Sequence, residues 1–146
     1  MRYLSSVLIL KIGITIVLWF VPLLFFPVSC LERMGFPTFP SAIFLRLLGM
    51  AYGALLVGYI FGWAATRRGE YPDSTVWAGI VSNGGAFLLL AIGASQGAWA
   101  DWGAPARGLM WTSLAATGLI STGLISFGPW SRSASAHRNP HKKTFE

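Results

Sequence analysis

Residues 44–66 read FLRLLGMAYGALLVGYIFGWAAT, and this stretch decides the fold. After Arg46 it continues for 20 residues without a charged side chain. A helix rises about 1.5 Å per residue, so this run is long enough to cross the roughly 30 Å hydrocarbon layer of a bilayer. The stretch therefore predicts a membrane-spanning helix.

The same stretch contains two pairs of glycines, each separated by three residues. The first pair is Gly49 and Gly53, and the second is Gly58 and Gly62. At about 100° per residue, the two pairs point to nearly opposite sides of a helix. Small residues let neighbouring helices approach closely in a membrane. We therefore predict that this helix packs against partners on two sides.

Four runs without charge organise the whole chain. They cover residues 12–31, 47–66, 74–100 and 108–131, in a chain that is 54% apolar and only 11% charged. The sequence predicts an all-α fold, an integral membrane four-helix bundle in one domain over residues 1–130. We expect helices near residues 4–26, 43–66, 75–95 and 107–127. The polar, basic residues 131–146 are expected to form a disordered tail.

The net charge is +6, and the positions of the basic residues indicate how the chain crosses the bilayer. If the spans alternate, only Arg33, Arg46 and Arg107 lie on one side. The positive-inside rule then predicts a multi-pass protein of the inner (plasma) membrane with both termini in the cytoplasm. We therefore expect lipid, and no nucleic acid, as the partner of these charges. The basic residues of the other side are Arg2, Lys11, Arg67, Arg68, Arg132, Arg138, Lys142 and Lys143.

A few polar side chains within or beside the spans are candidates for function. Lys11 is expected to snorkel to the cytoplasmic surface, the alternative being a functional cation inside the membrane. Asn83 must find a hydrogen-bond partner, either on another helix or on a ligand. Arg46 can bind a lipid phosphate, a carboxylate-bearing ligand or Glu32, or it can anchor the end of its helix. Glu32 can also simply face water. Arg46, Asn83 and Glu32 are therefore the candidate ligand or lipid contacts.

Features of the other segments lead to structural expectations. Pro22 removes a backbone hydrogen bond and should kink the first helix. The prolines of residues 27–41 argue against a regular helix there, and Ser41 is a candidate cap for the next one. Ser113, Thr117, Gly118, Ser121 and Thr122 make a small, hydroxylated surface on the last span, suited to close packing or to lining a pore.

The inventory for catalysis is short. No histidine, aspartate or glutamate lies inside a span, so neither a haem held by two helix histidines nor a carboxylate metal site has obvious ligands. We predict no catalytic residue and no metal site, and the cofactor stays open. A surface enzyme remains an alternative. It would use residues that share one side of the membrane: Glu32, Arg33, Arg46, Asp101 and Arg107.

Three motifs in residues 44–91 resemble those of a known family. They are FLRLLG at 44–49, AYGALLVGY at 51–59 and, after a basic loop, TVWAGIVSNGG at 75–85. This stretch is similar to the small bacterial membrane proteins of the DoxX-like group, which includes BphX-like proteins. The resemblance implies a four-span inner-membrane protein with cytoplasmic termini. Some relatives are thought to be subunits of a thiosulfate to quinone oxidoreductase, and no catalytic residue is carried over.

Two functional hypotheses follow. The first is a non-enzymatic subunit or accessory protein of a bacterial inner-membrane complex, whose partners are other membrane subunits or a second copy. The second is a membrane component that handles a quinone or another small molecule, with its site near Arg46 at the outer interface.

Overall fold

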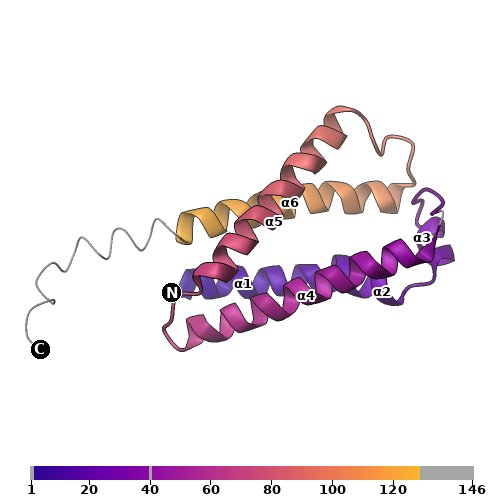
Figure 1. The fold of residues 1–146 in the computed structure, drawn as a ribbon. Coiled ribbons are helices and arrows are strands. Elements are labelled where there is room, and N and C mark those ends of the chain that lie inside the picture. The colour runs from indigo at the N-terminus through magenta and orange to yellow at the C-terminus, as the bar shows by residue number, and fades with distance from the viewer. Residues whose placement is uncertain (1, 40, 129–146) are drawn as a thin grey trace, which may run out of the picture.

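The computed structural model describes residues 2–39 and 41–128, and over this part of the chain it is helical without strands (Figure 1). The first span combines α1 (Arg2–Thr15), the π-helical turn η1 (Ile16–Phe20) and α2 (Val21–Phe25). It is followed by α3 (Val28–Arg33), α4 (Ala42–Arg67), α5 (Asp73–Ser95) and α6 (Ala104–Phe127). Four helices are long and apolar enough to cross a membrane, which confirms the predicted fold class. The predicted tail lies outside the described residues.

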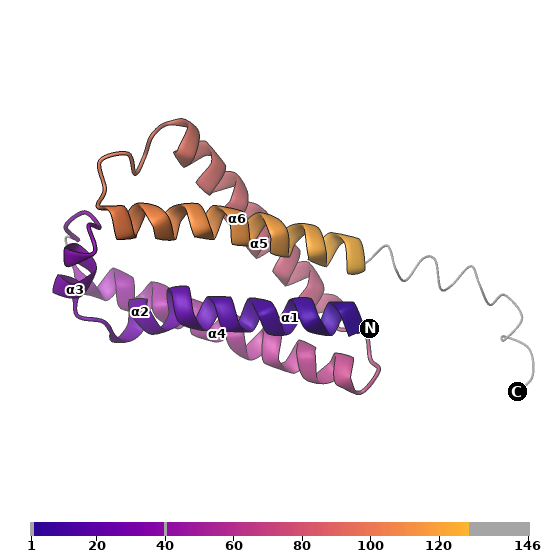
Figure 2. The ribbon, with the colours of Figure 1, turned by 180° about the vertical axis from the view of Figure 1, so that it is seen from behind.

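The long helices form two antiparallel pairs. The first span packs against α4, α5 packs against α6, and α1 joins the pairs by contacting α6. The start of α1 and the end of α6 lie at one end of the bundle (Figures 1 and 2). Helix α3 and the α5–α6 connection lie at the opposite end, which we call the α3 end, and α5 diverges from α6 toward it. Successive spans therefore run in opposite directions between the two ends of the bundle, as expected.

The π-helical turn directly precedes Pro22. Proline has no N–H, so it cannot donate to the carbonyl of Leu18, one turn before it. In η1 the N–H of Val21 instead reaches back five residues to the oxygen of Ile16. The helix then continues through Pro22 to Phe25. The irregularity expected at Pro22 is thus a local widening of the helix, and Trp19 lies within it.

The connection between the first two spans differs from the expectation. Val28–Arg33 forms α3, although residues 27–41 were predicted to contain no regular helix. The prediction was wrong because Pro27 stands at the N-cap of α3, where a missing N–H costs little, and Pro37 follows the end of that helix. Ser41 does cap α4, since its hydroxyl accepts from the N–H of Ile43 at 3.3 Å.

The glycines of α4 face different neighbours. Gly49 lies against the backbone of Leu23 and Leu24 in α2, and Gly53 lies against the ring of Phe20. Gly62 faces Thr75 of α5, whereas a Cβ atom built on Gly58 would meet nothing within 4 Å. Helix α4 therefore packs on two sides within its own chain, and Gly58 is left exposed.

At the α3 end, two glycines hold the connections together. Gly103 donates its N–H to the oxygen of Gly35 at 3.0 Å, and Ala106 donates to Met34 at 3.1 Å. Gly35 has a φ of +88°, a left-handed conformation that favours glycine. The backbones approach so closely that a Cβ atom on Gly103 would lie 2.7 Å from the Cα of Gly35. These contacts fix α3 against the start of α6.

Candidate functional site

A polar pair lies inside the bundle and joins α1 to α5. The ammonium of Lys11 donates a hydrogen bond to the Oδ1 of Asn83, at 2.8 Å. The two residues are only 4% and 5% exposed. The ammonium also lies 4.3 Å from the centre of the Tyr59 ring, a geometry that attracts a cation to the face of the ring. Three helices thus contribute to one charged site.

Helix α5 fixes the orientation of Asn83. Its Nδ2 donates to the backbone oxygen of Gly79 at 2.6 Å, which directs Oδ1 toward Lys11. Nearby, the hydroxyls of Tyr59 and Ser82 share a hydrogen bond of 2.8 Å. The amide and the aromatic ring that face the ammonium are therefore each held by a second contact.

The expectation that Lys11 snorkels to the surface was wrong. The side chain stays inside the bundle because Asn83 and Tyr59 offer an acceptor and an aromatic face at its own depth. The alternative, a functional cation inside the membrane, stays a prediction. Asn83 has found the interhelical hydrogen bond that the sequence required.

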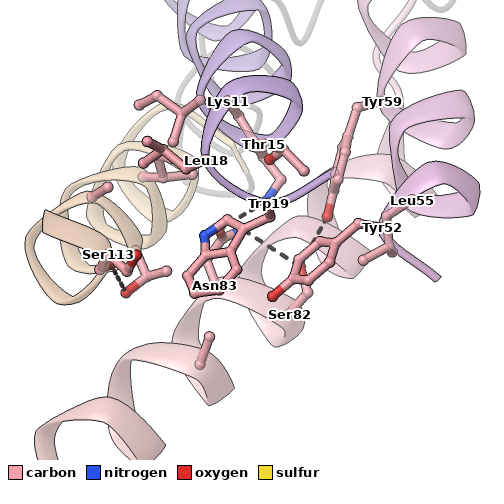
Figure 3. Close-up of a pocket in the computed structure, with 15 residues that line it drawn as sticks. Lys11, Thr15, Leu18, Trp19, Tyr52, Leu55, Tyr59, Ser82, Asn83 and Ser113 are labelled. Carbon is pink, nitrogen blue, oxygen red and sulfur yellow. Dashed lines mark hydrogen bonds between the residues drawn. The ribbon is translucent and has the colours of Figure 1, made fainter. Parts of the chain in front are cut away.

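A cavity of about 60 Å³ opens beside this pair (Figure 3). About 30 Å³ is the share of liquid volume that one water molecule takes, so the cavity has room for a few atoms of a ligand or for water. We call it the polar cavity. Residues of all four long helices line it: Lys11, Ile14, Thr15, Leu18, Trp19, Tyr52, Leu55, Tyr59, Ser82, Asn83, Ala86, Ser113, Ala116, Thr117 and Ile120.

The polar cavity offers hydrogen-bond donors. Lys11 has three N–H groups, and Asn83 accepts one of them. Thr15, Trp19 and Tyr52 also line the cavity, and none donates a side-chain hydrogen bond to another described residue. On α6 the hydroxyl of Ser113 is already committed to the backbone oxygen of Leu109, at 2.7 Å. A ligand that fits this site is therefore one rich in acceptors.

No acidic side chain within the described residues balances the charge of the site. Among the acidic residues that the structure describes, only Asp73 lies in a long helix, as the first residue of α5. The one ion pair found within 4.0 Å in the described residues joins Arg68 and Glu70, in the α4–α5 connection. A buried charge is normally paired with an opposite charge. Lys11 has an amide and an aromatic face in place of a carboxylate.

A second hollow adjoins the polar cavity at Leu18 and Trp19, which line both. Its volume is about 210 Å³, and we call it the apolar hollow. It extends toward the α3 end, since its walls include residues of α2, α3 and the following connection. The remaining lining residues are Val17, Pro22, Leu23, Phe26, Leu31, Met34, Phe36, Phe39 and Leu109.

Arg46 is occupied by the backbone of α2. Pro27 cannot donate to the carbonyl of Leu23, and the guanidinium of Arg46 takes its place with a hydrogen bond of 2.7 Å. A second bond of 2.7 Å reaches the oxygen of Phe26. Glu32 is exposed and makes no ion pair with Arg46. Arg46 thus caps carbonyls at the end of α2, a role that the sequence did not suggest.

Sequence reasoning missed several residues of the polar cavity. Thr15, Tyr52 and Tyr59 were not among the candidates from the sequence. One signal was available, because Lys11, Thr15 and Trp19 are spaced by four residues and share a face of the first span. That face could not be assigned to Asn83 without knowing which helices are neighbours.

Comparisons with known proteins add no assignment. The resemblance to the DoxX-like group stays a prediction. The chain matches no family model, no curated protein and no solved structure.

Proposed function

We propose that this protein is a small integral membrane protein that binds a small molecule inside its helix bundle, in the polar cavity beside Lys11 and Asn83. The observation that carries the proposal is a buried ammonium that lines a cavity and has no carboxylate partner in residues 2–39 and 41–128. We propose the centre of the bundle as the binding site in place of the region near Arg46, because the guanidinium of Arg46 is committed to α2.

A purely structural polar pair would not need the surrounding donors. Charged residues within a membrane are costly, and they usually mark a binding site or a pathway. Here the donors of Thr15, Trp19 and Tyr52 surround the same space as Lys11. A quinone, whose carbonyl oxygens accept hydrogen bonds, belongs to the class of molecules that this arrangement suits.

The substitution Lys11→Met tests this function. Methionine keeps much of the length and apolar volume of the lysine stem but removes its charge and its donors. We expect the wild-type protein to copurify with a small molecule, and we expect the variant to retain at most about a tenth of it, since charge-assisted hydrogen bonds are the stronger kind. Mass spectrometry of solvent extracts from protein purified in mild detergent measures the ratio.

Arg107→Met is the matched control, because it removes an exposed cation outside both cavities. Retention of the molecule in this variant and its loss in Lys11→Met support the proposal. Equal amounts in all three proteins, or no bound molecule in the wild type, contradict it.

A second candidate function is an accessory subunit of a larger membrane complex. The observation that favours it is the exposed Gly58, which lies in a hollow of about 360 Å³ between α4 and α5. Small residues line much of this hollow, and close approach of another helix requires such a surface. The partner is another membrane protein or a second copy of the chain. The hollow is lined by Ala51, Ala54, Leu55, Gly58, Tyr59, Thr75 and Ala78.

Gly58→Leu tests the accessory role. Leucine would project into the hollow, and its Cβ meets nothing within 4 Å. We expect the variant to migrate as a smaller particle in mild detergent, whereas Gly13→Leu, at another open position, should leave the particle unchanged. An identical particle size for Gly58→Leu and the wild type would exclude this surface as the contact.

For the location, we propose the inner membrane of a bacterium, with both termini in the cytoplasm. The support is the excess of basic residues on that side, which persists when the buried Lys11 is no longer counted. A reporter enzyme fused to the C-terminus should be active when it requires the cytoplasm. Activity restricted to a reporter that requires the extracytoplasmic space would reverse the orientation.

A further inference from the structure

The two adjoining cavities differ in chemistry, and this difference points to the shape of the ligand. The polar cavity presents a cation and several donors, whereas the walls of the apolar hollow are almost entirely hydrocarbon and aromatic. Leu18 and Trp19 form the boundary between them. We infer that the ligand is a single-chain amphiphile with a carboxylate head, such as a fatty acid. This inference rests on the proposed binding function.

The charge of Lys11 selects an anionic head. An isolated ammonium in a low-dielectric interior is unfavourable unless an opposite charge lies nearby. The described part of the chain supplies no carboxylate at this depth, and an anionic ligand would supply one. A carboxylate has four lone-pair positions, which can accept from Lys11 and from the donors of Thr15 and Trp19.

The volumes select a small head and a longer apolar body. The polar cavity, at about 60 Å³, is the smaller of the two and takes the head. The apolar hollow, at about 210 Å³, takes a segment of a hydrocarbon chain. Burying each methylene group there gains about 0.8 kcal/mol relative to water, so a chain in this hollow adds to the affinity of the head.

Trp19 occupies the position where head and chain would meet. It belongs to η1, the π-helical turn in which an N–H bonds to the carbonyl five residues earlier. Its ring stacks on the ring of Tyr52, with 5.8 Å between the two centroids. Single π-helical turns occur frequently at functional sites. The indole combines an apolar face with one N–H donor, which suits contact with both parts of an amphiphile.

The experiment uses the full-length protein in phosphatidylcholine nanodiscs, with ¹⁵N at the lysine side chains and ¹³C at the carboxyl of palmitate. Solid-state NMR recoupling detects a contact between these two nuclei directly. The chain has three lysines, Lys11, Lys142 and Lys143. We expect a contact that is lost in Lys11→Met and kept in the double variant Lys142→Met/Lys143→Met.

Competition with the wild-type protein gives a test that does not depend on any variant. Palmitate should displace bound labelled palmitate at a concentration about tenfold lower than its methyl ester, because the ester lacks the charge. A contact that persists in Lys11→Met, equal potency of acid and ester, or no contact in the wild type overturns the inference. A contact between Lys11 and the phosphorus of added phosphatidylglycerol, with none to palmitate, overturns it in favour of a phospholipid head.

Failure of the fatty-acid inference can be distinguished from failure of the proposed binding function. If a neutral molecule such as a quinone copurifies in a Lys11-dependent way and palmitate makes no contact, the carboxylate is wrong and binding in the polar cavity stands. If neither a copurified molecule nor palmitate depends on Lys11, both proposals fall together.

Discussion

Replacing Asn83 with leucine should lower the free energy of unfolding by about 3 kcal/mol, because the substitution leaves the buried ammonium of Lys11 without its acceptor. Hydrogen bonds to charged groups contribute about 1.5–3 kcal/mol, and an uncompensated buried charge costs more than the lost bond itself. Unfolding titrations with SDS in mixed micelles measure the change.

The reverse substitution should be much milder. Lys11→Met removes the charge together with the bond, and the Nδ2 of Asn83 keeps its contact with Gly79. The Oδ1 of Asn83 then loses its donor, but this oxygen is neutral, so we expect Lys11→Met to cost only about 1 kcal/mol. We expect the double variant Lys11→Met/Asn83→Leu to recover most of the stability lost in Asn83→Leu, because it removes both the charge and the amide. This asymmetry is the signature of a buried charge and would not arise from packing alone.

Gln96→Leu serves as the control, because Gln96 is an exposed amide directly after α5. It should change the stability by no more than about 0.5 kcal/mol. Equal costs for Asn83→Leu and Lys11→Met, with no recovery in the double variant, would show that the charge of Lys11 is not what Asn83 stabilises.

The second large effect is expected at Gly103. Alanine at this position would place its Cβ 2.7 Å from the Cα of Gly35 and 3.1 Å from the oxygen of Met34. These are backbone atoms, so they cannot turn away as a side chain can. The hydrogen bonds from Gly103 to Gly35 and from Ala106 to Met34 would have to lengthen or break. We expect a loss of about 2–4 kcal/mol from the two backbone bonds and the associated strain.

The measurement is the same SDS titration, with Gly108→Ala as the matched control. Gly108 lies in the same helix, and a Cβ there would meet nothing within 4 Å. Alanine should stabilise α6 at that position by up to about 1 kcal/mol, because it is the better helix former. We expect the two alanine substitutions to change the free energy of unfolding in opposite directions. If Gly103→Ala left it unchanged, the contact between Gly35 and Gly103 would not be needed for stability.

Most of the fold could be predicted because hydrophobicity acts locally along the chain. The run of 20 uncharged residues after Arg46 predicts a span without any knowledge of the helices that pack against it. The serine cap of α4 was predictable for the same reason, since it depends on residues two apart. The helix α3 was missed because Pro27 acts as a start signal there, and the prolines of this segment were interpreted only as breakers.

The candidate site was predictable only in part. Asn83 was identified because an amide in hydrocarbon needs a partner, yet the identity of that partner depended on which helices are neighbours. The sequence left Arg46 with several possible roles, and only the fold showed that it compensates for the missing N–H of Pro27.

By itself, the sequence determined that this chain is a helical membrane protein with four spans, because the solvent of each segment follows from its own composition. Only the tertiary structure decided what the polar groups do. Lys11 and Asn83 are separated by 72 positions and meet because α1, α5 and α6 pack together. Packing brings distant side chains to the same depth, and a buried charge then takes the nearest acceptor in place of water.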